Sequence, residues 1–338
     1  MADPSNGEIL GMASYPTFNL NDPRKLTGMY TDEEIKDMSD EEYRNHLYSL
    51  WTNYCVSESY EPGSTFKPVT VASALEEGVV KDGDTYVCKG FETVADYKLK
   101  CHVFSTIGSH GSLTVEQALM NSCNPYMIHL ALEMGNSRFA YYQSLFGFGK
   151  ITGIDLPGET TGIVYGDRMT TIDAACNSFG QTINVNMMQM MAAYCSIING
   201  GMLYQPHIVK RIESANGEVV KEYKANLVRQ TITASTSKLL RRYLKNTVEE
   251  GTAKKAGVTG YSVAGKTGTA QKGDRKDNKW IISFIGHAPA ENPKFAIYVV
   301  IDEPYGTTGT SGSSADVLTL THNILCLLYT SDAADEAR

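Results

Sequence analysis

The sequence lacks the features of a membrane-spanning chain and of a nucleic-acid-binding protein. It contains no run of about 18 apolar residues, which a helix needs to cross a bilayer, and no apolar segment after a basic start, as a secretion signal requires. Aspartate and glutamate (38) outnumber lysine and arginine (30), so the net charge is −8. Such a balance provides no basic surface for nucleic acid, and we predict no nucleic-acid partner.

Cysteine and histidine, seven of each, form no familiar ligand pattern. The cysteines are odd in number and scattered, unlike the dense framework of a small secreted domain. Residues 85–88 and 97–101 resemble two strands joined by a turn, which would place Cys88 and Cys101 opposite each other, as a disulfide or as two free thiols. No histidine has the paired spacing with Cys, Asp or Glu that indicates zinc. We therefore predict no metal ion and no cofactor.

What the sequence does contain is the composition of an ordinary globular protein, with 42% hydrophobic and 20% charged residues. Residues 8–13 resemble a core strand very near the start, so we expect further protein upstream. Residues 21–48 are polar and are predicted to form a surface segment in which Thr31 and Ser39 cap helices. Helical spacing continues at 64–77, at 114–134 with a break near 121–125, and at 186–198.

From residue 260 the periodicity changes to that of strands. Apolar stretches at 261–271, 280–287 and 295–302 are separated by polar turns. Short turns of this kind favour antiparallel neighbours, and a closing helix at 315–328 would cover one face of the sheet. The predicted fold class is α+β, with helices packed on an antiparallel sheet.

Three short motifs carry the chemistry: S-T-F-K at 64–67, S-C-N at 122–124 and K-T-G-T at 266–269. Ser64 and Lys67 are three residues apart on a helix and share a face, so the amine can approach the hydroxyl. Lys67 can act as a base only if it is partly neutral, which requires burial or a second cation such as Lys266. The amides at the helix start favour negative charge that develops near Ser64. Together these groups indicate acyl transfer.

Each motif alone recurs by chance, and an isolated S-x-x-K reads as a capped helix with a surface lysine. Their order and context are more specific, because the set S-x-x-K, S-x-N and K-T-G is similar to that of penicillin-binding proteins and class A β-lactamases. Longer strings at 8–16, 60–68, 146–159 and 264–271 resemble class B, monofunctional penicillin-binding transpeptidases of the Gram-positive division and sporulation type. The resemblance covers nearly the whole chain and leaves the roles in elongation, division and spore-cortex synthesis open.

The resemblance implies a penicillin-binding fold with an antiparallel sheet of about five strands, flanking helices and an inserted all-helical subdomain. It predicts a transpeptidase domain at 1–325, followed by a polar tail at 326–338 that is unlike the usual closing helix and is not expected to be native. It also implies an enzyme on the outer face of the bacterial cytoplasmic membrane, with its anchor outside this chain. The expected partners are peptidoglycan stem peptides, β-lactam antibiotics and, as a candidate, a glycan polymerase.

The implied reaction is D,D-transpeptidation through a serine acyl-enzyme formed on a D-Ala-D-Ala stem peptide. Ser64 would be the nucleophile, Lys67 its base and Ser122 a proton relay toward the leaving amine. The backbone amides of Ser64 and Thr269 would stabilise the oxyanion. Substrate binding would fall to Asn124 for the amide, to Lys266, Thr267 and Thr269 for the terminal carboxylate, and to Gly268, which keeps the strand free of bulk.

The chain departs from the family pattern at three positions. Cys123 stands where the family motif has Asp, and we expect its side chain to point away from the pocket, so it is not a catalytic thiol. Thr182 and Asn186 stand where Gly and Thr are expected before the Met-rich helix.

Three other functions remain to be tested. The first is a serine β-lactamase or β-lactam sensor, which shares the acylation apparatus and differs in whether water reaches the acyl-enzyme. The second is a nucleotide-binding protein, because residues 260–267 match the phosphate-loop pattern, which requires a helix to begin at the lysine. The third is a noncatalytic scaffold, although every reactive position is filled.

Overall fold

The computed structural model describes residues 1–26, 30–273, 279–304 and 313–335. Its centre is an antiparallel sheet of order β11-β10-β9, formed by β9 (Ala264–Lys272), β10 (Lys279–Ala288) and β11 (Phe295–Asp302). Near the N-terminus, Ala2 pairs with Ala296 of β11 and with Ile9 through single bridges and so extends the sheet at this edge. The predicted α+β fold is confirmed, but the central sheet of the described residues has three strands where about five were expected.

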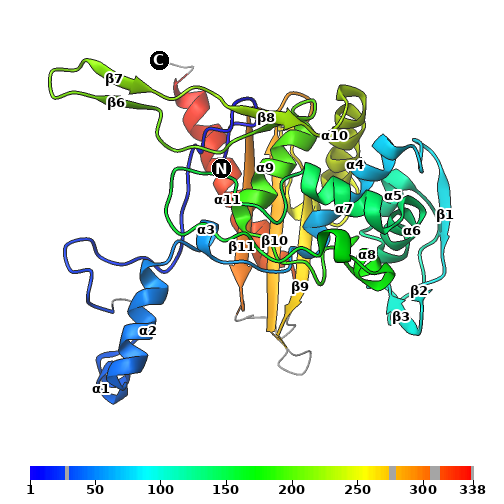
Figure 1. Ribbon diagram of the computed structural model, residues 1–338, viewed down its shortest axis with the longest axis horizontal. Helices are drawn as coiled ribbons and strands as arrows, with labels where there is room; N and C mark the ends of the chain where they lie inside the picture. The colour runs from blue at the N-terminus through cyan, green and yellow to red at the C-terminus, as the bar shows by residue number, and fades with distance from the viewer. Residues whose placement is uncertain (27–29, 274–278, 305–312, 336–338) are drawn as a thin grey trace.

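The two faces of the sheet are covered by different helices, as Figure 1 shows. Successive side chains of a strand point to opposite faces. Ile282 and Phe284 of β10 accordingly join a core with Val317 and Leu318 of α11 (Ala315–Asp335). Ile281 and Ile285 of the same strand face the larger helical core.

The helical side is arranged around α4, whose residues 67–74 are all buried. Predicted helices at 64–77, 114–134 and 186–198 are confirmed in outline, with capping boxes at Thr114 and at Asn186. The helices of this side are α4 (Lys67–Glu77), α5 (Val115–Met120), α6 (Asn124–Met134), α7 (Asn136–Leu145), α8 (Thr171–Asn177), α9 (Met187–Ile198) and α10 (Ala234–Glu249), with the short turn η2 (Gly166–Arg168). The turn η3 (Lys254–Ala256) instead buries Ala256 in the core beneath α11.

Short ribbons lie outside the central sheet. One pairs β1 (Thr85–Cys88) with β4 (Gly111–Thr114), and a second pairs β2 (Phe91–Val94) with β3 (Tyr97–Lys100). The remaining pairs are β5 (Met202–Tyr204) with β8 (Leu227–Gln230) and β6 (Arg211–Glu213) with β7 (Val219–Glu222).

The predicted pairing of 85–88 with 97–101 is therefore wrong. Only two residues separate β2 from β3, so these neighbours close on each other as a hairpin and leave β1 to pair with β4. Cys88 and Cys101 are unbridged thiols in the structure, which contradicts the disulfide alternative and agrees with that of two free thiols.

The polar surface segment predicted at 21–48 is confirmed, and it contains α1 (Asp32–Asp37) and α2 (Asp40–Trp51). The short helix α3 (Tyr54–Ser57) follows it. Thr31 and Ser39 each form the predicted cap, with a capping box. In Figure 1 α1 and α2 extend away from the body of the molecule. None of the helices in the described ranges combines the length and the apolar character needed to cross a bilayer.

At the other end, α11 continues from Ala315 to Asp335 and so runs across the predicted boundary between 325 and 326. The division into a domain at 1–325 and a tail at 326–338 stays a prediction.

Candidate active site

Ser64 lies in η1 (Gly63–Phe66), a short 3-10 helix that leads into α4. The Lys67 amide donates to the Ser64 carbonyl three residues earlier, so this turn is tighter than the α-helix predicted from residue 64. Pro68 then occupies the first turn of α4, where an amide hydrogen has no intrahelical acceptor. The proline therefore breaks no helical hydrogen bond, and Ser64 is presented immediately before α4.

A close approach of backbone segments holds this turn in place. The Gly63 amide donates to the Gly180 carbonyl over 2.9 Å. Gly180 has φ +80°, and a Cβ on it would lie 2.7 Å from Gly63 N and closer still to Gly63 O. A Cβ on Gly63 would lie 2.5 Å from Thr269 O of β9. The segments that carry the predicted oxyanion amides, those of Ser64 and Thr269, are thus adjacent.

Lys67 connects the first two motifs. Its side chain is fully buried, and its Nζ donates to Ser122 O at 2.6 Å, Ser122 Oγ at 3.0 Å and Asn124 Oδ1 at 2.6 Å. Ser122 Oγ in turn donates to Ser64 Oγ at 3.0 Å. No hydrogen bond joins Lys67 to Ser64 directly within the described residues, so the predicted base reaches the nucleophile through Ser122.

The position of Ser122 depends on a strained turn between α5 and α6. Ser122 has φ +55°, a left-handed conformation that non-glycine residues seldom adopt. The turn is held by hydrogen bonds from the Ser122 amide to Leu119 O at 3.2 Å and from the Cys123 amide to Ala118 O at 2.8 Å. Cys123 is the N-cap of α6 and is fully buried, as expected for a side chain that points away from the nucleophile. Strain of this kind persists only where the surroundings enforce it.

The third motif lies on β9, which is an edge strand of the central sheet. Lys266 is fully buried, and its Nζ donates to Thr267 O at 3.1 Å and Thr267 Oγ1 at 3.4 Å. The hydroxyls of Thr252 and Thr267 are 3.4 Å apart. Because Lys266 lies inside a strand and no helix begins there, the phosphate-loop interpretation is wrong.

Gly268 is constrained by the packing behind the strand. A Cβ at this position would lie 2.9 Å from Pro62 O and from Thr65 Cγ2, and closer still to Ser283 Oγ. The absence of a side chain is therefore required for β9 to pack against the Ser64 turn. A role of Gly268 beside the substrate stays a prediction.

Burial controls the charge of both lysines. It lowers the pKa of Lys67 to about 8, partly opposed by the thiols of Cys123 and Cys101. Burial, followed by repulsion from Lys67, lowers the pKa of Lys266 well below its usual value. A neutral fraction of Lys67 is thus available near neutral pH, while a bound carboxylate would favour the charged form of Lys266.

Acylation at this site is expected to accelerate as the pH rises through about 8, because only the neutral Lys67 amine accepts a proton. Below that pKa, the first-order acylation constant at saturating fluorescent penicillin should fall about tenfold per pH unit. Stopped-flow measurements at saturation separate this chemical step from carboxylate binding, and circular dichroism at each pH checks the fold. A rate constant that does not change across the pKa would contradict Lys67 as the base.

Two departures from the family pattern have structural explanations. Thr182 has φ +59°, a conformation that favours the glycine expected there, and its hydroxyl accepts from Asn177 Nδ2 at 2.9 Å. Asn186 caps α9 by accepting from the Gln189 amide at 2.8 Å, as a threonine hydroxyl can.

A second group of reactive side chains, which no sequence pattern predicted, lies directly behind the S-C-N turn. Its members, whose ligand atoms all lie within 4.8 Å of one another, are Cys88, Cys101, His110 and Cys123. The closest two in sequence, Cys101 and His110, are nine positions apart. Ligands so far apart form no short sequence motif that would predict the cluster. The one indication in the sequence was Cys123, which stands where the family motif has Asp.

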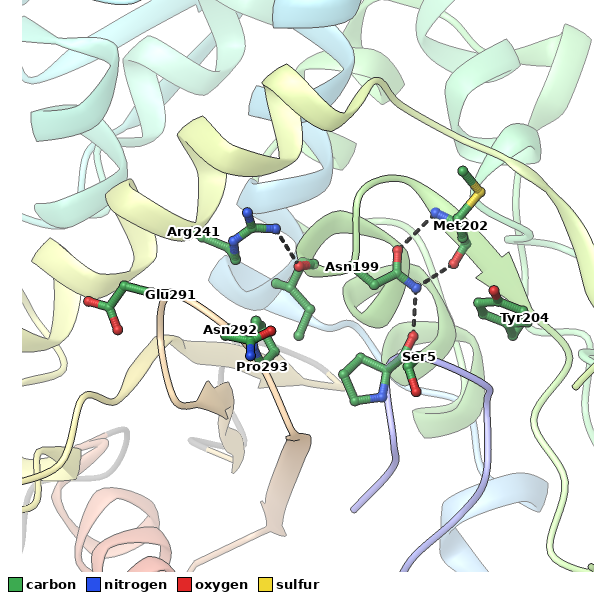
Figure 2. A pocket seen from close by; sticks show the side chains of 10 residues that line it. Ser5, Asn199, Met202, Tyr204, Arg241, Glu291, Asn292 and Pro293 are labelled. Atoms are coloured by element: carbon green, nitrogen blue, oxygen red, sulfur yellow. Dashed lines mark hydrogen bonds between the residues drawn. The ribbon is translucent and has the colours of Figure 1, made fainter.

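A hollow of about 270 Å³ lies elsewhere, between the N-terminal segment, the end of α9 and α10 (Figure 2). Asn199 Nδ2 donates there to Pro4 O and Met202 O, and Arg241 donates to Ile198 O. None of the predicted site residues lines this hollow. Its polar groups link chain segments to one another.

Known proteins with similar sequences point to the same family as the three motifs of the site. A sequence model described as the penicillin binding protein transpeptidase domain matches residues 1–324. The chain belongs to this family. Stage V sporulation protein D of Bacillus subtilis is 39% identical over 319 residues, covering 93% of this chain and 46% of that protein. Peptidoglycan D,D-transpeptidase FtsI of Escherichia coli K12 is 31% identical over 309 residues, covering 90% of this chain and 46% of that protein.

The fold of the family is shared as well. The crystal structure of the D,D-transpeptidase domain of a peptidoglycan glycosyltransferase from Eggerthella lenta has a TM-score of 0.79 and 27% identity, covering 96% of this chain and 77% of that chain. This chain spans about half the length of the curated relatives it matches. Relatives named for sporulation and D,D-transpeptidation agree with the class B resemblance.

Proposed function

We propose that this chain is the acyl-transferring domain of a peptidoglycan D,D-transpeptidase. The observation that carries the proposal is the continuous hydrogen-bonded path from Lys67 Nζ through Ser122 Oγ to Ser64 Oγ. The path supplies a nucleophile, a buried amine with a lowered pKa and a hydroxyl between them, which are the groups that serine acylation requires.

In the acylation step, Ser64 Oγ attacks the carbonyl carbon of the penultimate D-alanine. Both hydroxyl hydrogens first turn, so that Ser64 donates to Ser122 and Ser122 donates to the neutral Lys67 amine, the reverse of the directions in the resting path. The Ser64 proton then passes to Ser122, whose own proton passes to Lys67. The tetrahedral oxyanion accepts hydrogen bonds from the amides of Ser64 and Thr269. The proton then returns through Ser122 to the leaving amine, and the terminal D-alanine departs.

In the second step, an amine of a neighbouring peptidoglycan strand attacks the carbonyl carbon of the acyl-enzyme. The ester bond to Ser64 breaks, and the free Ser64 hydroxyl is restored. Before the terminal D-alanine departs, the donor stem peptide is held by Asn124 at its amide and by β9 at its terminal carboxylate. The groups on the strand are Lys266, Thr267 and Thr269, with Gly268 between them.

The cellular setting that we propose is supported by the relatives rather than by the site. Proteins named for peptidoglycan D,D-transpeptidation and for spore formation support a position on the outer face of the bacterial cytoplasmic membrane. The partners we propose are stem peptides, β-lactam antibiotics and a glycan polymerase of the cell-wall machinery.

The proposal predicts a long-lived penicillin adduct on Ser64. Intact-mass measurement after incubation with benzylpenicillin should show one adduct per chain, and peptide mapping should place it on Ser64. The adduct should persist for many minutes, and Ser64→Ala should remove it. Rapid loss of the adduct with release of hydrolysed penicillin would instead indicate a β-lactamase, and an adduct at another residue would overturn the assignment.

Transfer itself is tested with a peptide that ends in D-Ala-D-Ala and a labelled D-amino acid as acceptor. Exchange of the terminal residue, detected by mass spectrometry, is expected for the wild-type protein and not for Ser64→Ala. A stable penicillin adduct without any exchange would favour the β-lactam sensor.

A further inference from the structure

The four side chains behind the S-C-N turn converge from separate elements. Cys88 ends β1, Cys101 follows β3, His110 precedes β4 and Cys123 caps α6. The three cysteines are 3% exposed or less. Groups so distant in sequence meet only because two ribbons and α6 pack together, at the edge of the helical side in Figure 1.

The distances match those of a tetrahedral metal centre. Zn–S bonds of about 2.3 Å and Zn–N bonds of about 2.0 to 2.1 Å place ligand atoms about 3.8 Å apart for two sulfurs and about 3.6 Å for sulfur and nitrogen. Cys101 Sγ lies 3.5 Å and Cys88 Sγ 3.8 Å from His110 Nδ1, and all four ligand atoms lie within 4.8 Å of one another. The available space is thus that of one small cation.

The donor set is also selective. Three thiolates and one imidazole suit Zn²⁺, whereas Mg²⁺ and Ca²⁺ prefer oxygen. All four positions come from the protein, which is the arrangement of a closed structural site rather than a catalytic one. The Gly90 amide approaches Cys88 Sγ at 3.4 Å, a hydrogen bond of the kind that supports a ligating sulfur.

We propose that the S-C-N turn is anchored by a structural Zn²⁺ ion, bound by Cys88, Cys101, His110 and Cys123. Binding releases up to three thiol protons to solvent as three Zn–S bonds and one Zn–N bond form, with no change of oxidation state. The ion ties both ribbons to the start of α6. Two-stranded ribbons are marginal by themselves, so a metal link between them and α6 stabilises the region.

The site also bears on the predicted catalytic hydroxyl, a point that rests on the proposed function. Cys123 lies between Ser122 and Asn124, so a metal bond to Cys123 holds the turn in which Ser122 has φ +55°. Cys123 then acts as a positioning residue: it touches no substrate and fixes the backbone that aims Ser122 at Ser64.

The first test measures metal and needs no enzymatic activity. Protein purified under reducing conditions from zinc-supplemented cells should contain about one zinc per chain by elemental mass spectrometry. After removal of zinc, Co²⁺ should produce the sulfur-to-metal charge-transfer and visible bands of a tetrahedral cysteine-rich site. Less than a tenth of a zinc per chain together with an absent Co²⁺ spectrum, or an oxidised Cys88–Cys101 pair in the freshly isolated protein, would overturn the proposal.

Variants assign the ligands. Cys101→Ser and His110→Ala should each lower zinc affinity at least about tenfold in a competition assay with a chromogenic chelator. Cys55→Ser is the matched control, since Cys55 is a buried thiol outside the cluster that bonds only to Ala13 O in the described residues. Because a ligand variant can misfold, the Co²⁺ spectrum of the wild-type chain remains the deciding measurement.

A final measurement separates the metal site from the proposed function. Removing zinc should slow acylation by fluorescent penicillin at least about tenfold, and one equivalent of Zn²⁺ should restore it. Zinc binding without any effect on acylation would retain the metal site and overturn the positioning role. Absence of acylation in the metal-loaded wild type would instead overturn the proposed function.

Discussion

Lys67→Met is expected to reduce the rate of acylation by penicillin by about 10² to 10⁴, the range attributed to a positioned general base. Methionine has a similar length and is apolar, so it fills the buried space and removes only the amine. The path from Ser64 through Ser122 then ends without a proton acceptor. Stopped-flow fluorescence with a labelled penicillin measures the effect.

The fold should survive this change. Burial lowers the pKa of Lys67, which means that the folded state disfavours its charged form, and the variant removes that cost. Three hydrogen bonds to Ser122 and Asn124 are lost in exchange, so the melting temperature should shift by only a few degrees. Lys238→Met, on the exposed face of α10, is the control. Acylation by Lys67→Met within tenfold of the wild type would show that Lys67 is not the base.

Gly180→Ala is expected to reduce the rate of acylation by at least about 10²-fold, although Gly180 lies outside the three motifs. A Cβ at Gly180 would lie against the Gly63 backbone, 2.7 Å from its nitrogen, and must displace the turn that presents Ser64. Since a shift of about 1 Å in a reacting group can cost 10²-fold, we expect at least that loss of acylation rate. Differential scanning fluorimetry should also show a lower melting temperature, because the neighbouring atoms are backbone and cannot turn away.

A second glycine provides the matched control for this prediction. Gly217 has φ +81°, almost the same as Gly180, yet nothing lies within 4 Å of a Cβ built on it. Gly217→Ala therefore carries the backbone strain of a left-handed alanine without the collision. Equal acylation rates for the two variants would show that the contact between Gly180 and Gly63 does not position the nucleophile.

Much of the fold could be predicted because its signals are local. The capping boxes at Thr31, Ser39 and Thr114 depend on side chains three residues apart. The strands near 264, 279 and 295 were predicted within a few residues, since alternation and polar turns are read within one segment. The exact start of the helix at Ser64 was not, because the 3-10 turn is set by contacts with Gly180 and Thr269 far along the chain.

Pairing between segments was harder to predict. Cys88 was predicted to lie beside Cys101 through a hairpin that does not form, and the two thiols nevertheless lie in one cluster. Their meeting depends on how both ribbons pack on α6, which no spacing within the ribbons encodes.

The amino-acid order alone established the residue types, the helix and strand periods and the family resemblance, because each depends on neighbours within a turn or a strand. The folded chain decided the rest: that Lys67 reaches Ser64 through Ser122, that Ser122 is held in a left-handed turn, and that four ligands converge behind it. The proton path joins residues 55 and 58 positions apart, and the four ligands span residues 88–123. Their free energy comes from burial and packing of whole elements, which only the three-dimensional arrangement specifies.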